Sequence, residues 1–241
     1  MLILFTDFGY NGPYLGQMKA VIYQKAPQLQ VIDLFADAPV HNPKASAYLL
    51  ASYATAFPFG SVFLAVVDPG VGSHERKPAI VHADGRWFVG PDNGLFNVIA
   101  SRASKFDAWH VSWCPQGLSA TFHGRDLFAP LAAKLGTGQF PEEGEVVRAC
   151  IEKWPSELYE IIYVDHFGNL ITGIRAETVA EDASLRIGSV LVPRVRTFSD
   201  VTAGSPLCYE NSNGLLEIAV NQGRAEAYFR VSVGEQVYLV V

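Results

Sequence analysis

Short apolar runs and longer amphipathic stretches alternate along the first third of the chain. The short runs are rich in Val, Ile, Leu and Phe, which is typical of strands buried on both faces of a parallel sheet. They cover residues 2–5, 31–34 and 61–67. Between them, apolar residues recur at helical spacing over residues 14–25 and 44–56. This alternation predicts an α/β N-terminal domain with a mostly parallel central sheet.

Turn-forming residues organise the next stretch of the chain. Asp84-Gly85 lies between two short strand-like runs, 79–82 and 87–89, and this arrangement predicts a β-hairpin. Further expected elements are a turn at 91–94, a helix that opens at 95 and a helix over 125–135.

The pattern changes near residue 141. From there to the end, short apolar runs separated by Gly, Asn and Pro replace the long helical stretches, which predicts a smaller all-β domain. The runs include residues 158–164, 189–192, 215–220 and 236–241. We therefore expect an N-terminal domain over 1–150 and a C-terminal domain over 157–241.

Composition narrows the class of protein. The 241 residues are 49% hydrophobic and 17% charged, a balance that favours a folded chain over a disordered one. The net charge of −6, without a Lys/Arg cluster, argues against a nucleic-acid or membrane-surface partner. Cys114, Cys150 and Cys208 are too scattered for a disulfide framework or a cysteine zinc site. With no signal-peptide pattern and no apolar run of membrane-spanning length, we expect a cytoplasmic protein.

Two aspartates follow predicted parallel strands. Asp7 and Asp68 stand where ligands of open α/β sheets bind, and the glycines after them let backbone approach a ligand closely. Each aspartate alone is more typical of a turn or helix cap, but two at equivalent positions favour a site. Arg76 follows Asp68 by eight positions. It could return to the strand end and pair with Asp68, hold an anionic nucleophile, or be a surface arginine.

A dense polar cluster, TFHGRD at 121–126, precedes the last predicted helix of the first domain. His123 can take or give a proton near neutral pH, and Asp126 is placed to stabilise the first helical turn. In the second domain, DHFGN at 165–169 and NSNG at 211–214 are candidate ligand loops or plain hairpin turns. Glu217 lies inside an apolar strand, where a carboxylate needs a partner or a ligand.

Six motifs occur in a set order along the whole chain: TDFG with GPY, VVDPGVG, PDNGL, TFHGRD, D-FGN and LEIAVN. In this combination the chain resembles the S-adenosyl-L-methionine hydroxide adenosyltransferases, relatives of the fluorinating and chlorinating adenosyl enzymes. The resemblance implies a barrel-like all-β C-terminal domain and a homotrimer with sites at subunit interfaces. It also implies hydrolysis of S-adenosyl-L-methionine to adenosine and L-methionine by water or hydroxide attack at C5′, with no cofactor and no metal.

The resemblance also assigns residues. The implied catalytic triad is Asp68, Arg76 and His123. The implied substrate-binding residues are Asp7, Asp68, Phe167, Asn169, Tyr209, Ser212, Glu217 and Val220. The halogenating relatives have tyrosines at the positions of Asp68 and His123 and a halide-holding serine at that of Gly124, so we expect no halogenation.

Two alternatives stay open. One is a metal-dependent hydrolase that uses Asp7, Asp68, His123 and Asp126, since carboxylates and imidazoles suit Mg²⁺ or Mn²⁺. Against it, no metal-type spacing such as H-x-x-x-H or D-x-D occurs. The other is a module that binds adenosine or S-adenosyl-L-methionine without turning it over.

Overall fold

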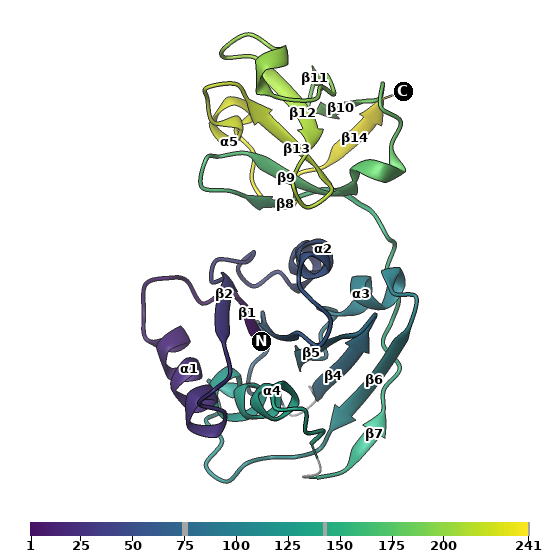
Figure 1. Ribbon diagram of the computed structural model, residues 1–241. Coiled ribbons are helices and arrows are strands. Elements are labelled where there is room, and N and C mark those ends of the chain that lie inside the picture. Colours follow the sequence, from purple (N-terminus) through teal and green to yellow (C-terminus); the bar gives the residue numbers. More distant parts are fainter. Residues whose placement is uncertain (74–76, 142–143, 241) are drawn as a thin grey trace. The chain divides into compact units, whose positions relative to one another are not determined.

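A computed structural model describes residues 1–73, 77–141 and 144–240 (Figure 1). Contacts divide the chain into two compact units, one formed by Met1–Ala51 and Phe57–Trp154, the other by Ser52–Ala56 and Pro155–Val241. Each unit is described by itself.

The first unit is built on a seven-stranded sheet. Its strands are β1 (Leu2–Thr6), β2 (Val31–Phe35), β3 (Val62–Val66), β4 (Pro78–Ala83), β5 (Arg86–Pro91), β6 (Phe106–Val111) and β7 (Val146–Arg148). Its helices are α1 (Tyr14–Lys25), α2 (Pro43–Tyr53), α3 (Asn97–Arg102) and α4 (Ala129–Gly136), with a π-helical turn over Gly124–Phe128. The last two residues of α2, Ser52 and Tyr53, group with the second unit.

The strand order β2-β1-β3-β5-β4-β6-β7 corrects the expectation of a mostly parallel sheet. Strands β2, β1, β3 and β5 are parallel to one another. The pairings β5–β4, β4–β6 and β6–β7 are antiparallel, so the sheet is mixed. The cause is the predicted hairpin, which the structure confirms: Asp84 and Gly85 both have positive φ, 44° and 76°, as a type I′ turn requires. That turn reverses β4 against β5, which itself pairs with β3.

One face of the sheet is covered by α1 and α4, and α2 and α3 lie on the other face (Figure 1). In α1, the completely buried Met18 and Ile22 are four residues apart and so share one side of the helix. They join a core that includes Leu2, Leu4, Val62, Leu64, Leu131 and Leu135. Strand β1 is buried along its whole length, as a central strand between two helical layers must be. This rigid core fixes the carboxyl ends of β1 and β3.

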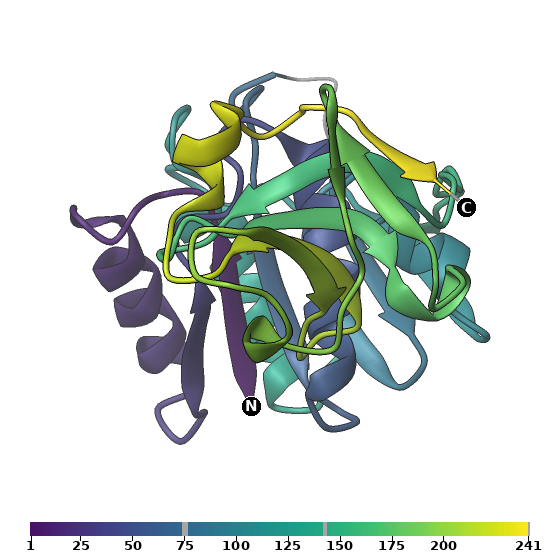
Figure 2. The same ribbon diagram turned by 90° about the horizontal axis from the view of Figure 1, so that it is seen from above.

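The second unit holds two antiparallel sheets, of order β12-β13-β9-β8 and β11-β10-β14. Its elements are β8 (Leu158–Val164), β9 (Leu170–Arg175), β10 (Ser184–Ile187), β11 (Val190–Val192), β12 (Pro206–Glu210), β13 (Leu215–Val220), α5 (Ala225–Phe229) and β14 (Val237–Val240). Figure 2 shows them from above, in green to yellow, with β14 ending at the C-terminal label. Isolated bridges Glu160–Gln236 and Arg194–Cys208 connect the edges of the two sheets.

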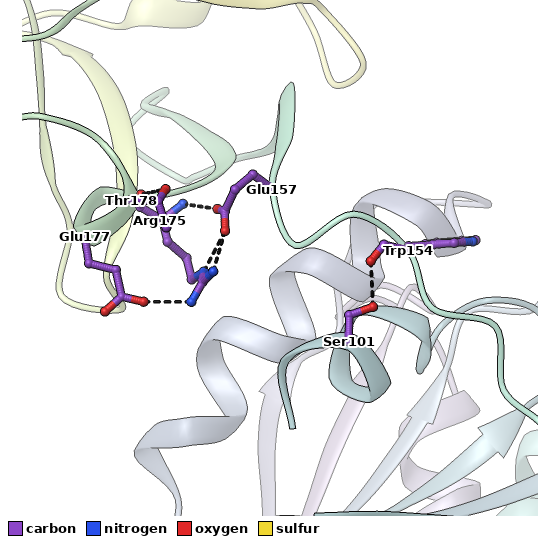
Figure 3. A network of polar contacts seen from close by, with 6 residues as sticks. All are labelled: Ser101, Trp154, Glu157, Arg175, Glu177 and Thr178. Carbon is purple, nitrogen blue, oxygen red and sulfur yellow. Dashed lines mark hydrogen bonds and ion pairs between the residues drawn. The ribbon is translucent and has the colours of Figure 1, made fainter. Parts of the chain in front are cut away.

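The connection between the units is anchored at both ends (Figure 3). On the first unit, the Ser101 hydroxyl donates to the Trp154 carbonyl at 2.6 Å. On the second, Arg175 Nη2 and Nε donate to Glu157 Oε1 at 2.6 and 2.8 Å, and the Arg175 amide donates to Oε2 at 2.7 Å. Each anchor therefore holds the connecting chain to its own unit.

Candidate functional site

The carboxyl ends of β1 and β3 open into a cavity of about 340 Å³ in the first unit. These strands are parallel neighbours in register, so Asp7 and Asp68, one and two residues beyond their ends, reach the same edge of the sheet. The cavity is lined by Asp7, Phe8, Tyr14, Val40, His41, Val66, Asp68, Val71, Thr121, Phe122, His123, Gly124 and Phe128. Asp7, Asp68 and His123, which the sequence singles out from distant motifs, thus share one cavity.

Backbone amides help to hold both carboxylates. The His41 amide donates to Asp7 Oδ2 at 3.0 Å, and the Gly70 amide donates to Asp68 Oδ1 at 3.3 Å. His41 was not expected at the site; its positive φ of 56° belongs to a turn whose contact with Asp7 spans 34 residues of sequence. A contact between residues so far apart along the chain leaves no local pattern in the sequence.

His123 directly precedes the π-helical turn Gly124–Phe128. Such turns insert one extra residue into a helix and are frequent at functional sites, because they re-aim side chains at the helix start. Gly124 is buried behind the aromatic wall of the cavity: a Cβ there would lie 3.3 Å from both Phe8 and Phe122. The glycine therefore allows those two rings to close beside His123.

Asp126 has a different role from the one that the metal alternative requires. Arg125 donates to the Asp126 carboxylate twice, from Nε to Oδ1 at 2.6 Å and from Nη2 to Oδ2 at 2.9 Å. The Ser119 amide also donates to Oδ2, at 2.9 Å. The hydrogen bond from Arg125 is the main cause that lowers the pKa of Asp126, against the opposing effect of burial. Asp126 does not line the cavity, and it ties the chain at Ser119 to the helix that follows His123.

A second cavity of about 250 Å³ shares Asp68, His123 and Phe128 with the first. Its other lining residues include Ser73, Lys77, Ser112 and Cys114. Asp68 and His123 therefore stand between two spaces. Arg76, the third predicted catalytic residue, lies outside the described residues.

The second unit carries a separate pocket of about 820 Å³. All the substrate-binding residues that the sequence places in this unit line it: Phe167, Asn169, Tyr209, Ser212, Glu217 and Val220. Asn169 is buried and its amide group donates to Asp165 Oδ2 at 3.1 Å, while Phe167 is 70% exposed at the tip of the turn from β8 to β9. The pocket thus presents an open aromatic ring beside buried polar groups.

Glu217 is the most unusual residue of this pocket, because its side chain is only 5% exposed on β13. The register of β12 and β13 places Tyr209 directly opposite, and the Tyr209 hydroxyl donates to Glu217 Oε1. The Asn211 amide donates to Oε2 at 3.0 Å. Burial is the main cause that raises the pKa of Glu217, and these two hydrogen bonds oppose it.

Among the described residues, no cation pairs with Glu217. The nearby negative charge of Asp165 raises the pKa of Glu217 further. A buried carboxylate held by neutral donors suits a ligand that brings positive charge. Asn211 received no role from the sequence pattern. Its position two residues after Tyr209 in the NSNG turn is the signal that would have found it.

Among the described residues there is neither a group of metal-binding side chains nor a membrane-spanning helix. Within the described ranges, no group of three or more His, Cys, Asp or Glu side chains is arranged to hold a metal ion. In the same part of the chain, every helix is too short or too polar to cross a membrane.

Comparison with known proteins identifies the family. Residues 2–145 match the SAM hydroxide adenosyltransferase N-terminal domain and residues 159–238 match its C-terminal domain. The chain therefore belongs to the SAM hydroxide adenosyltransferase family, which confirms the resemblance that its motifs indicate.

Individual relatives agree with this family. An (R)-S-adenosyl-L-methionine hydrolase of Thermus thermophilus is 39% identical, over 98% of this chain and 97% of the relative. A fluorinase of Actinopolyspora mzabensis is 24% identical, over 92% of this chain and 90% of the relative. Among solved structures, an uncharacterized conserved protein from Thermotoga maritima superposes with a TM-score of 0.88 at 32% identity, with full coverage of both chains.

Proposed function

We propose that this protein hydrolyses (R)-S-adenosyl-L-methionine to adenosine and L-methionine. One observation carries the proposal: Asp7, Asp68 and His123 meet in one cavity at the carboxyl ends of β1 and β3. The family match and the name of the Thermus relative supply the substrate. Because the prefix L fixes the α-carbon, the prefix (R) refers to the pyramidal sulfonium sulfur.

The chemistry asks little of the protein beyond positioning and proton transfer. Water attacks C5′, the C5′–S bond breaks with its electron pair moving to sulfur, and one proton is released. The methionine thioether leaves as a neutral group, so no general acid is needed. Holding water in line with the C5′–S bond supplies much of the rate.

The proposed roles follow from this reaction. His123 orients the water and accepts its proton. Arg76 stabilises developing hydroxide character, and Asp68 holds Arg76 and contacts the ribose. Asp7 contacts the ribose or the methionine side. The smaller cavity next to Asp68 and His123 gives the water a place apart from the nucleoside. No cofactor or metal takes part.

The pocket of the second unit supplies the remaining contacts in this proposal. Phe167 flanks the adenine and Asn169 binds the nucleoside. Glu217, which pairs with no cation among the described residues, takes the α-ammonium group of methionine. The Tyr209 hydroxyl holds the carboxylate of Glu217 in place. Ser212 and Val220 complete the pocket.

The proposal includes the domain limits 1–150 and 157–241, a cytoplasmic location and a barrel-like C-terminal domain. The bridges Glu160–Gln236 and Arg194–Cys208 support the barrel, because together they link the outer strands of both sheets into a ring. It also includes a homotrimer in which each site combines the first unit of one subunit with the second unit of a neighbour.

Methionine release from purified protein tests the function. We expect adenosine and methionine in equal amounts from the (R) epimer, at a rate that survives dialysis against EDTA. Release no faster than in buffer alone would overturn the hydrolase and favour the binding module. Activity lost on EDTA dialysis and restored by Mg²⁺ or Mn²⁺ would favour the metal-dependent alternative.

Mixing two inactive variants tests the shared site. Asp68→Asn disables the first unit and Glu217→Leu disables the second. If neighbouring subunits complete each site, trimers reassembled from a mixture of both variants contain some sites with two intact halves. We expect the mixture to regain activity that neither variant has alone. Activity that stays at the level of the separate variants would exclude a site shared in this way.

A further inference from the structure

The PDNGL motif at residues 91–95 does not line the 340 Å³ cavity, and only its Pro91 lines the smaller one. The function proposed above gives no role to Asp92 and Asn93. It begins at the last residue of β5 and continues into the turn before α3. In the sheet, β5 lies between β3 and β4. The connection from β3 to β4 carries Asp68. Because β3 runs parallel to β5 and β4 runs antiparallel to it, both ends of this connection lie at the carboxyl end of β5, where the motif stands.

Two consecutive residues of the motif bond to the two ends of that connection. At its start, the Asn93 amide group donates to the Val67 carbonyl at 2.8 Å. At its end, the Asp92 backbone amide donates to the Lys77 carbonyl at 3.1 Å. Val67 is the residue before Asp68 and is completely buried, so the first bond acts on the peptide group that Asp68 itself shares.

Other contacts make the motif a rigid support. Asn93 Oδ1 accepts from the Leu95 amide at 3.3 Å, which fixes the orientation of its side chain. Asp92 Oδ2 lies 2.6 Å from His110 Nε2 on β6, so the turn is also held to the far side of β4. Gly90 allows β5 to lie close against β3, since a Cβ there would lie 2.0 Å from the Ala65 carbonyl oxygen.

From these contacts we propose that Asn93 is a positioning residue for Asp68, and that Asp92–Asn93 forms a clip across the ends of the β3–β4 connection. The inference rests on the proposed function for the role of Asp68. The clip acts through the backbone, which explains how a motif without substrate contact serves catalysis. Small displacements of a catalytic group are costly in rate, because the reacting atoms must stay aligned.

Asn93→Ala removes the bond to Val67 and leaves the substrate pocket unaltered in composition. We expect kcat for methionine release to fall about 10- to 100-fold while KM changes less than about 3-fold. Ser101→Ala is the matched control: it removes a bond from a side chain to a carbonyl, at 2.6 Å to Trp154, just beyond the same turn (Figure 3). Wild-type kcat in Asn93→Ala would overturn the proposal.

A double-mutant cycle separates positioning from a general loss of structure. If Asn93 acts through Asp68, then Asn93→Ala lowers the residual kcat of Asp68→Asn by less than about 3-fold. If Asn93→Ala lowers kcat by the same factor in Asp68→Asn as in the wild type, Asn93 does not act through Asp68.

Amide hydrogen exchange gives a readout that needs no substrate. Exchange across residues 68–73 should be about 2- to 10-fold faster in Asn93→Ala, as expected for one lost hydrogen bond. If the wild type releases no methionine, the proposed function fails, and exchange alone decides the clip. Unchanged exchange would then reject it.

Discussion

Replacement of His123 by alanine is expected to lower kcat for methionine release by about 10²- to 10⁴-fold, the range that a positioned general base contributes. His123 lines both cavities together with Asp68, and this position supports its proposed role as the acceptor of a proton from the attacking water. Its side chain is not expected to carry binding energy for the nucleoside. The dissociation constant of adenosine should therefore change less than about 3-fold.

Single-turnover kinetics and calorimetric titration with adenosine measure the two effects separately. Arg76→Ala is expected to behave like His123→Ala. His82→Ala is the control, because His82 lies in the same unit but stacks on Trp87, with ring centroids 4.3 Å apart, and does not line either cavity. Wild-type turnover by His123→Ala would remove the histidine from the mechanism, and equal losses in kcat and adenosine affinity would make it a binding residue.

Local patterns predicted the parts of the fold whose causes are local. Buried runs identified β1 and β3, and Asp84-Gly85 identified the hairpin, because positive φ at both positions is rarely met by other residues. The direction of each strand within the sheet was beyond such patterns. It depends on β5 pairing between β3 and β4, a contact decided by the whole sheet rather than by any one segment.

The candidate site divides in the same way. Asp7, Asp68 and His123 were found because strand ends and a loop before a helix mark such residues in sequence. The π-helical turn after His123 was missed, since it spans only Gly124–Phe128, and one turn is too short for its periodicity to be distinguished from that of an α-helix. The bond from Asn211 to Glu217 was missed because it depends on the turn that sets the register of β12 and β13.

Glu217→Gln is expected to raise KM about 30-fold or more. It is also expected to stabilise the free protein at pH values above the folded pKa of Glu217. The rise in KM follows from the charge, because a substrate ammonium would lose a buried ionic partner. Such a loss typically costs about 2–5 kcal/mol, and each 1.4 kcal/mol weakens binding tenfold. Glutamine keeps the size of the side chain and one acceptor for the Tyr209 hydroxyl.

The gain in stability follows from the raised pKa of Glu217, whose main cause is burial. Because the folded-state pKa lies above the unfolded value, the folded protein holds this proton more tightly. The associated stability is fully present below the unfolded pKa and is lost as pH rises through the folded pKa. Above the folded pKa, the ionised Glu217 therefore destabilises the fold, and glutamine relieves that cost.

Thermal unfolding at several pH values and steady-state kinetics check both effects. The difference in Tm between Glu217→Gln and wild type should grow as pH rises through the folded pKa of Glu217. Glu210→Gln, at an exposed carboxylate at the end of β12, is the control and should change neither quantity. A Glu217→Gln variant with wild-type KM would show that the carboxylate does not meet the substrate. A lower Tm for Glu217→Gln above the folded pKa would show that the hydrogen bonds of Glu217 outweigh the cost of burying its charge.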